Sequence, residues 1–339
     1  MPREIHTRLR PTGGIEEYEA IVNLRRTVID PPQDSPANQR QRYKLPGWVL
    51  GKLEVLAQSR FAIPEASGKS RAQLRTWSLD DPDAVWSIVH TVHASSRIEN
   101  EGVHANEVPV VYHAITKTAG QNTRELNQRQ EAERDISLTY FWALSQDRRP
   151  ILSVEFILEL HRRMFHGSRG EMAGRIKTEP VIIADDEREH FDVTTLAPEK
   201  AEAFLRAACE RTNRAFHEAD QYAQHSKLIL IAEFLVDFLA IHPFKDGNGR
   251  TARLLSTYLL ERSGYHFAQF YPIDQVILDD RNAYFEALFS AQEHWYLPSE
   301  DLTPWIEFYV KAVFKQWERA FAEIRDRAMK KATDPGVST

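Results

Sequence analysis

The chain has 339 residues, which allows one large domain or two small ones. Hydrophobic residues make up 42% of it and charged residues 27%, the balance of an ordinary globular protein. The formal net charge of -6 excludes a bulk electrostatic attraction to nucleic acid or to an anionic membrane. Cys209 is the single cysteine, so no disulfide can form within the chain and we expect a reducing, cytoplasmic compartment. The first residues lack the apolar core of a signal peptide, and no apolar run is long enough to span a bilayer, so we expect no membrane partner.

Residues 1–80 are expected to form a peripheral extension of helices and linkers. Residues 15–29 are compatible with a short helix, and residues 30–41 have the Pro, Asp, Asn and Ser content of a loop. Residues 48–61 show helical spacing of apolar side chains, and this helix is predicted to end near Pro64.

The next helix is predicted to begin at residues 80–82, because an acidic cap followed by proline is typical of a helix start. It reaches Ser95 and Glu99, which are four residues apart and therefore share one face. Two interpretations stay open at this point. The polar end is an exposed terminus that stops at Gly102, or Ser95 and Glu99 form a functional pair.

The middle of the chain predicts further helices and one hairpin. Helical spacing covers residues 125–145 and 198–213, and Ser153 is a typical cap for a helix that contains His161. We expect His161 to pack and hydrogen-bond rather than to catalyse. Residues 181–193 hold β-branched side chains on both sides of an acidic turn, which predicts a short hairpin. No other stretch gives a convincing strand signal, so the predicted fold class is all-α with one short β-hairpin.

The strongest functional signal lies between two apolar helices, at residues 241–253. Pro243 ends the first helix, and Gly247 and Gly249 allow a turn without Cβ atoms directly before the second helix. The first N–H groups of a helix have no partners inside it, and the helix dipole adds partial positive charge there. Glycines let a phosphate approach such a backbone closely. The stretch therefore predicts an anion-binding cradle.

The side chains of this stretch suit the same chemistry. Arg250 and Arg253 lie three residues apart on one helix face, and two guanidinium groups suit a polyphosphate. Asp246 is a hard oxygen ligand that suits Mg2+ shared with phosphate oxygens. His242 is the side chain best able to take a proton near neutral pH. These are the parts needed to move a phosphorus group onto a hydroxyl, although a Gly-Asn-Gly turn is also a common connector.

This stretch resembles, at every position, the signature His-Pro-Phe-x-Asp-Gly-Asn-Gly-Arg-x-x-Arg of the Fic-domain family, whose members mostly transfer AMP from ATP to protein hydroxyls. The resemblance covers roughly residues 82–310. It implies a Fic fold, a helical bundle around the signature loop, with a catalytic core at residues 121–315 and a helix end and polar tail at residues 316–339. It implies that His242 is the catalytic base and that Asp246 is the metal ligand. The implied nucleotide-binding residues are Phe244, Gly247, Asn248, Gly249, Arg250, Arg253 and Tyr284.

Two further segments match the family. Residues 280–285 resemble its Arg-x-x-Tyr-Tyr stretch with Phe285 in place of the second Tyr, and for Tyr284 both a place near the nucleotide and a core role stay open. Ser95-x-x-x-Glu99-Asn100, within the region 81–120, resembles the inhibitory motif that class II members carry before the core. The implied mechanism is that Glu99 pairs with Arg253, excludes the γ-phosphate of ATP and leaves the α-phosphorus misaligned for attack.

The expected function is transfer of AMP from ATP to a Ser, Thr or Tyr hydroxyl of a target protein, with Mg2+ as cofactor and pyrophosphate as product. The target protein is unidentified and could be the chain itself, and a homodimer is left open. In the family the hairpin holds the target by strand addition, for which an exposed strand edge is suited. The alternatives are removal of AMP, transfer of UMP or phosphocholine, and a non-enzymatic nucleotide-sensing adaptor or toxin–antitoxin-like partner.

Overall fold

The computed structural model describes residues 42–116, 125–146, 151–183, 193–222, 227–295, 297 and 299–333. Over this part of the chain nearly all regular structure is helical, which confirms the predicted all-α class with one short hairpin. The predictions for residues 15–41, for the hairpin turn and for residues 334–339 lie outside the described residues. In chain order the elements are α2 (Gly47–Ser67), α3 (Arg71–Leu74), α4 (Pro82–Ile98), η2 (Ala105–Glu107), α5 (Val108–Thr116), α6 (Gln128–Leu144), α7 (Val154–Arg169), η3 (Gly170–Met172), β1 (Ile182–Ile183), β2 (Val193–Thr194), α8 (Pro198–Tyr222), α9 (Lys227–Ile241), α10 (Asn248–Arg262), η4 (His266–Gln269), α11 (Ile273–Asp279), α12 (Arg281–Glu293) and α13 (Thr303–Thr333).

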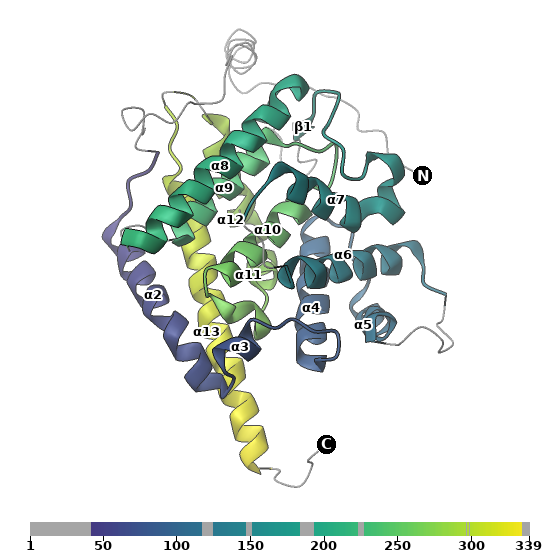
Figure 1. Ribbon diagram of the computed structural model, residues 1–339, viewed down its shortest axis with the longest axis vertical. Coiled ribbons are helices and arrows are strands. Elements are labelled where there is room, and N and C mark those ends of the chain that lie inside the picture. Colours follow the sequence, from purple (N-terminus) through teal and green to yellow (C-terminus); the bar gives the residue numbers. More distant parts are fainter. Residues whose placement is uncertain are drawn as a thin grey trace.

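Helices α9 and α10 lie at the centre of the molecule (Figure 1). Helix α9 is covered by α8, α12 and α13, while α10 contacts α4, α6, η4 and α9. Both helices are buried over almost their whole circumference. A helix buried on every side has no need of a polar face, which explains the nearly continuous apolar run of α9. The loop between them, residues 242–247, therefore lies where several elements converge.

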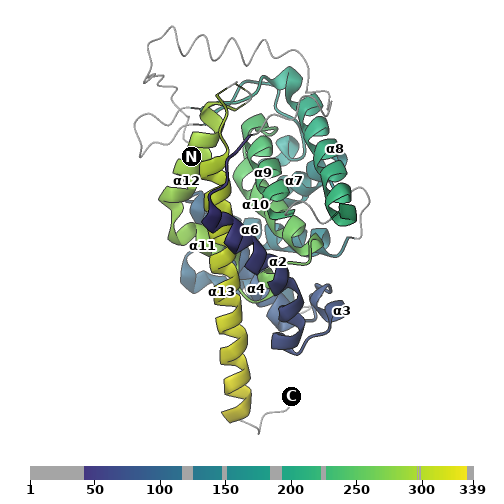
Figure 2. The ribbon, with the colours of Figure 1, turned by 90° about the vertical axis from the view of Figure 1, so that its left-hand side faces the viewer.

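Helix α13 is the longest helix in the described part of the chain and packs against α2, α9, α11 and α12. Its last turns extend beyond the rest of the bundle, as Figure 2 shows. The helix continues to Thr333, within the region predicted to hold a helix end and polar tail, and the rest of that region lies outside the described residues. Among the helices of the described residues, none has the length and apolar character needed to cross a bilayer.

Several predicted boundaries differ from the observed ones for local reasons. Helix α2 passes through Pro64 and ends one turn later, where Gly68 takes a left-handed conformation and its N–H bonds the carbonyl of Glu65. Helix α6 begins later than predicted, because Asn127 caps it in a reciprocal pair with Gln130. Helix α8 is longer than predicted, and η4 and α11 were not predicted at all.

The end of α4 is built as a left-handed cap. The side chain of Asp81 caps its start as predicted, but the helix stops at Ile98 and not at Gly102. Asn100 takes the left-handed conformation with φ 58°. The N–H groups of Asn100 and Glu101 bond back to the carbonyls of Arg97 and Ser96 at 3.1 and 3.0 Å, the two bonds of a Schellman motif. Asparagine tolerates this conformation better than most residues with a side chain.

The hairpin is short and is anchored at its base. Ile182 pairs with Thr194 and Ile183 with Val193 in antiparallel register. Beyond the strands, the N–H of Thr195 bonds the carbonyl of Val181 at 3.3 Å. Further bonds then join the segments on either side of the strands to the end of α9 and the loop that follows it.

A buried charged cluster fixes the other side of α9. Asp237 is 1% exposed and accepts hydrogen bonds from Arg42, Arg211 and the indole N–H of Trp295. Arg42 also pairs with Glu300 at 2.9 Å. Burial raises the pKa of Asp237, but the two arginines outweigh it and hold the pKa below its usual value. The cluster joins α9 to α8, to the segment before α2 and to the segment before α13.

Candidate functional site

His242 follows the last residue of α9 and is itself in a left-handed conformation, with φ 51°. Its ring Nδ1 lies 3.2 Å from the carbonyl oxygen of Leu239. Because a carbonyl can only accept, Nδ1 carries the proton and Nε2 keeps its lone pair. Burial, followed by the charge of Lys177, lowers the pKa of His242 to about 4, against the smaller raising effects of the Leu239 carbonyl, Glu99 and Asp246. At neutral pH the side chain is therefore a neutral imidazole with a free acceptor nitrogen.

His161 of α7 supports the loop after His242 by a hydrogen bond and a ring contact. The N–H of Gly174 donates to Nδ1 of His161 at 2.8 Å, so Nε2 carries the proton and donates to the carbonyl of Asp246 at 2.9 Å. The imidazole also stacks on the ring of Phe244, with centroids 3.7 Å apart. His161 thus packs and hydrogen-bonds, as predicted from the sequence.

Phe244 and Asn248 support the loop from within, which differs from their predicted place at the nucleotide. The Phe244 side chain is fully buried under the loop, so a ligand on the outer face cannot reach it. The Asn248 side chain bonds both the N–H and the carbonyl of Phe244, at 3.0 and 2.8 Å. Its amide group is consumed by the turn, and only its backbone N–H is left for a ligand.

The two glycines of the turn are required for different reasons. Gly247 caps α10 with φ 81°, and a Cβ there would lie 2.6 and 2.7 Å from ring atoms of Phe165. At Gly249 a Cβ would overlap the carboxylate of Glu99 and lie 3.2 Å from Nη1 of Arg253. The open face of Gly249 is thus the place where an oxyanion meets the start of α10, and in this structure the oxyanion is Glu99.

Arg253 is buried and linked to three residues. Its Nε donates to the hydroxyl of Ser95 at 2.7 Å, and its Nη2 donates to the carbonyl of Ser95 at 3.0 Å and to Glu99 at 2.8 Å. Asp274 of α11 lies 3.4 Å from Nε. Among the described residues, the buried Nη1 has no hydrogen-bond partner. The arginine is therefore fixed by α4 and α11 and keeps one donor for a further acceptor.

The two carboxylates beside Arg253 differ in exposure. Glu99 is 32% exposed, whereas Asp274 is fully buried. Burial raises the pKa of Asp274 to about 6 in spite of the opposing charge of Arg253. Asp274 is therefore a permanent part of the wall, while Glu99 lies at the solvent side of the cradle.

Arg250 has a second carboxylate partner that the sequence did not reveal. Its Nη1 pairs with Glu101 at 2.8 Å, and its guanidinium lies over the ring of Phe165 at 4.7 Å. Glu101 follows the left-handed Asn100, so the turn that ends α4 points Glu99 at one arginine and Glu101 at the other. The sequence shows that Glu101 lies two residues after Glu99, but its ion pair with Arg250 becomes visible only from the geometry of the turn.

Tyr284 is a core residue. Its side chain is 2% exposed and contacts the rings of Phe285, Trp305 and Phe308. Burial raises its pKa, and the charge of Arg253 lowers it by less. Of the two roles left open for this residue, the structure shows the core position, and the predicted contact of Tyr284 with a nucleotide stays a prediction.

Asp246 is a suitable ligand for a divalent cation that is shared with phosphate. Its side chain is half-exposed, accepts from the N–H of Gly247 and lies 3.8 Å from Arg250. The described residues contain no group of three or more His, Cys, Asp or Glu arranged for a metal. A single carboxylate beside an anion cradle fits Mg2+, which takes one or two carboxylates and fills its shell with water and substrate phosphates.

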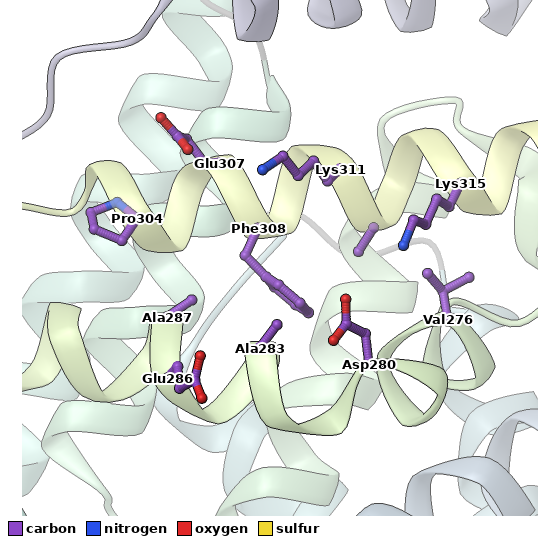
Figure 3. A pocket seen from close by; sticks show the side chains of 11 residues that line it. Val276, Asp280, Ala283, Glu286, Ala287, Pro304, Glu307, Phe308, Lys311 and Lys315 are labelled. Atoms are coloured by element: carbon purple, nitrogen blue, oxygen red, sulfur yellow. The ribbon is translucent and has the colours of Figure 1, made fainter.

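The structure thus brings together most of the predicted site: His242, Asp246, the glycine turn, both arginines, Ser95 and Glu99. Cys209, expected to be a buried thiol, is buried, and burial raises its pKa to about 12. A separate groove between α12 and α13 contains none of these residues (Figure 3). It is lined by mixed charges, including Asp280, Glu286, Lys311 and Lys315.

The fold and the signature loop both have known relatives. Residues 151–260 match the family model described as Fic/DOC family. The chain is 27% identical over 308 residues to "Protein adenylyltransferase Fic" of Nematostella vectensis, covering 88% of this chain and 62% of that protein. It is 28% identical over 178 residues to "Protein adenylyltransferase fic-1" of Caenorhabditis elegans, covering 52% of this chain and 32% of that protein. The chain therefore spans less than two thirds of the length of these curated relatives.

Solved structures share the architecture at lower identity. A Fic family protein from Desulfovibrio desulfuricans G20 has a TM-score of 0.60 at 20% identity, covering 88% of this chain and 78% of that one. A Fic domain containing signaling protein from Bacteroides thetaiotaomicron has a TM-score of 0.60 at 20% identity, covering 81% of this chain and 98% of that one. The bundle around the loop shares the Fic fold of these structures, and the match to the Fic/DOC family model covers residues 151–260 of the chain.

Proposed function

We propose that the protein transfers AMP from ATP to a Ser, Thr or Tyr hydroxyl of a target protein and releases pyrophosphate. The observation that carries the proposal is the position of the Glu99 carboxylate, on the open face of Gly249 and 2.8 Å from Arg253. A carboxylate held there marks a place built for an oxyanion, in the same loop as the neutral His242. The name adenylyltransferase, which the Nematostella and Caenorhabditis relatives carry, supports the same chemistry.

In this reaction His242 is the general base. Its Nε2 takes the proton of the target hydroxyl as that oxygen attacks the α-phosphorus of ATP, and the bond to pyrophosphate breaks. Arg250 and Arg253 bind the phosphates that leave as pyrophosphate. The N–H groups at the start of α10 bind the phosphate oxygens of ATP that lie nearer His242.

Asp246 is proposed to hold Mg2+ together with the phosphates. The ion, when bound, neutralises phosphate charge beside the cradle. A positive partner is needed there because Asp246, Asp274, Glu99 and Glu101 together outnumber the two arginines. The balance becomes positive only after the two glutamates withdraw and a divalent cation enters.

The excess of carboxylates over arginines around the cradle also supports inhibition of the site when no ligand is bound. Glu99 fills the face of Gly249 and Glu101 occupies Arg250, so a triphosphate meets two carboxylates where its outer phosphates belong. We propose that Glu99 is the main restraint, because it contacts the more deeply buried arginine. A restraint of this kind misplaces the α-phosphorus, and a displacement that depends on alignment then fails.

Removal of AMP from a modified protein is a second candidate, and the place of Glu99 favours it. A carboxylate on the open face of Gly249 can orient a water molecule towards the same phosphorus. The two activities are separated by incubating AMP-modified protein with the wild-type chain and Mg2+ and measuring free AMP. Removal predicts release that depends on Glu99, whereas transfer alone predicts none.

The test of transfer uses ATP labelled at either the α- or the γ-phosphate. The Glu99→Gly variant is incubated with each label, with Mg2+ and with a cell extract as the source of target. Label retained on protein only from the α position is expected. Label retained only from the γ position would show a kinase-like reaction, and label from neither position would contradict the proposal and favour a nucleotide-sensing role.

A further inference from the structure

Lys177 is a buried lysine that no motif of the loop includes. It lies between η3 and β1, and its residue is 4% exposed. Its Nζ donates to the hydroxyl of Thr195 at 2.7 Å and to the carbonyl of Ile241 at 3.1 Å. Its backbone N–H donates to the carbonyl of Pro243 at 2.8 Å. One residue thus bonds the carbonyls on both sides of His242.

The conformation of His242 makes these two bonds significant. A left-handed backbone is disfavoured for a residue with a Cβ, and it persists where the surroundings over-determine it. The loop needs this conformation, because α9 must end there and the imidazole must still bond Leu239. Lys177 bonds the carbonyl of Ile241, in the peptide group directly before His242, and the carbonyl of Pro243, in the peptide group that follows Pro243. The backbone on either side of His242 is therefore restrained by one residue.

We propose that Lys177 is a positioning residue for His242, which fixes the left-handed backbone of the base and ties it to the foot of the hairpin. The tie to the hairpin runs through Thr195, whose hydroxyl accepts from Lys177 and donates to the carbonyl of Val181 at 2.6 Å. The N–H of Leu196 completes it by bonding the carbonyl of Ala240 at 3.4 Å. The catalytic part of this inference rests on the proposed function, while the positioning of the imidazole does not.

The charge of Lys177 gives the inference a second readout. Three charged groups act on His242. Lys177 lowers its pKa and is the second largest cause after burial, whereas Glu99 and Asp246 raise it. Burial lowers the pKa of Lys177 itself to about 7, so its ammonium is charged at the acidic pH at which His242 titrates. Removing that charge must therefore raise the pKa of His242, and a purely structural lysine elsewhere would not do so.

The experiment compares Lys177→Met, Lys177→Arg and Lys315→Met. Methionine keeps the length of the side chain but has neither hydrogen-bond donors nor charge, whereas arginine keeps the donors and the charge. Lys315 is an exposed lysine of α13 and serves as the matched control. The His242 titration midpoint is measured by NMR on histidine-labelled protein, and AMP transfer is measured in the Glu99→Gly background. Melting temperatures are recorded for each variant.

Lys177→Met is expected to raise the titration midpoint of His242 towards the ordinary 6.5 and to lower kcat roughly 10- to 100-fold with the KM for ATP unchanged. Lys177→Arg is expected to restore part of both, and Lys315→Met to change neither. An unmoved midpoint in folded Lys177→Met would overturn the inference, whatever the activity. A moved midpoint without any transfer in the Glu99→Gly parent would support the positioning role and contradict the proposed function.

If Lys177→Met does not fold, Thr195→Val replaces it. Valine keeps the branched shape and removes the hydroxyl that holds Nζ. The same changes are then expected at smaller size, and a variant with unchanged midpoint and unchanged kcat would overturn the coupling between hairpin and base.

Discussion

Two arginine–carboxylate clusters flank the central helix pair, and they differ in how completely their hydrogen bonds are satisfied. Asp237 is 1% exposed and is surrounded by Arg42, Arg211 and Trp295, which all donate to it. Around Arg253, the donor Nη1 has no partner among the described residues, and Glu99 is 32% exposed. The first cluster is closed by the chain alone, whereas the second is complete only with a further acceptor.

The difference separates structural charge from functional charge. A buried pair stabilises a fold when every lone pair and proton is used, and it is costly to break. A cluster that leaves a buried guanidinium nitrogen without a partner carries a cost that a ligand can remove. We therefore expect the first cluster to serve folding and the second to serve binding, and substitutions should divide along that line.

The largest expected effect on stability lies at Asp237. Asp237→Ala removes the buried carboxylate that accepts from Arg42, Arg211 and Trp295, and should lower the free energy of unfolding by about 3–5 kcal/mol. Denaturant unfolding measures this loss. The matched control is Asp279→Ala, which breaks an exposed pair with Arg319 and should cost less than about 1 kcal/mol. Equal losses in both variants would remove the distinction between the clusters.

Unlike Asp237→Ala, Glu99→Gly should change activity and leave stability nearly unchanged. It releases Arg253 and opens the face of Gly249, so AMP transfer should rise about 10- to 100-fold while stability changes little. Label from α-labelled ATP measures transfer, and Glu286→Gln, an exposed carboxylate of α12, serves as the control. Transfer at the wild-type level would show that Glu99 is structural like Asp237.

The glycines of the turn sharpen the comparison within one loop. Gly247→Ala places a methyl against Phe165 in a left-handed backbone and should cost about 1–3 kcal/mol of stability. Gly249→Ala places the methyl where the oxyanion lies, so ATP affinity should fall with less loss of stability. Calorimetric titration and thermal unfolding of both variants test this, and a larger stability loss at Gly249 would contradict it.

Glu101→Gln should give a smaller gain than Glu99→Gly. Its side chain is 45% exposed, so its pair with Arg250 is expected to be worth about 1 kcal/mol or less, or up to about fivefold in rate. The gain should persist in the Glu99→Gly background, because the two carboxylates act on different arginines. A gain that vanishes in the double variant would show that only Glu99 restrains the site.

The smallest expected effect is on pH dependence. Burial holds the pKa of His242 at about 4, so the base is already neutral above that pH and transfer should show no acidic limb from His242 between about pH 5 and 7. Removal of Glu99 takes away a charge that raises this pKa and should move the limb further down. A limb near 6.5 in the Glu99→Gly variant would show that the imidazole is solvated.

The signature loop could be predicted from the sequence because its chemistry is local. The spacing of His242, Gly249 and Arg253 along one turn and one helix start sets their arrangement with little help from the rest of the fold. The capped start of α4 was predicted for the same reason. The inward direction of the Phe244 and Asn248 side chains was not predicted, because spacing alone does not show which side of a loop is buried.

The parts that could not be predicted depend on segments far apart in the chain. Asp274 and Lys177 are ordinary charged residues in the sequence, and only packing brings one against Arg253 and the other against the flanks of His242. Glu101 reaches Arg250 because Asn100, not Gly102, reverses the chain after α4. Asparagine in the left-handed region is common enough to be suspected but too variable to be inferred from the sequence alone.

The most direct test of the account compares Glu99→Gly with Glu99→Gly/His242→Ala. If the cradle binds the phosphates and His242 only accepts the proton, the second variant should keep ATP affinity and lose AMP transfer by about 10²- to 10⁴-fold. The rate of label transfer from α-labelled ATP, measured at saturating ATP, gives the result. Equal rates in the two variants would contradict the assignment of His242 as the base, and with it the central claim about this loop.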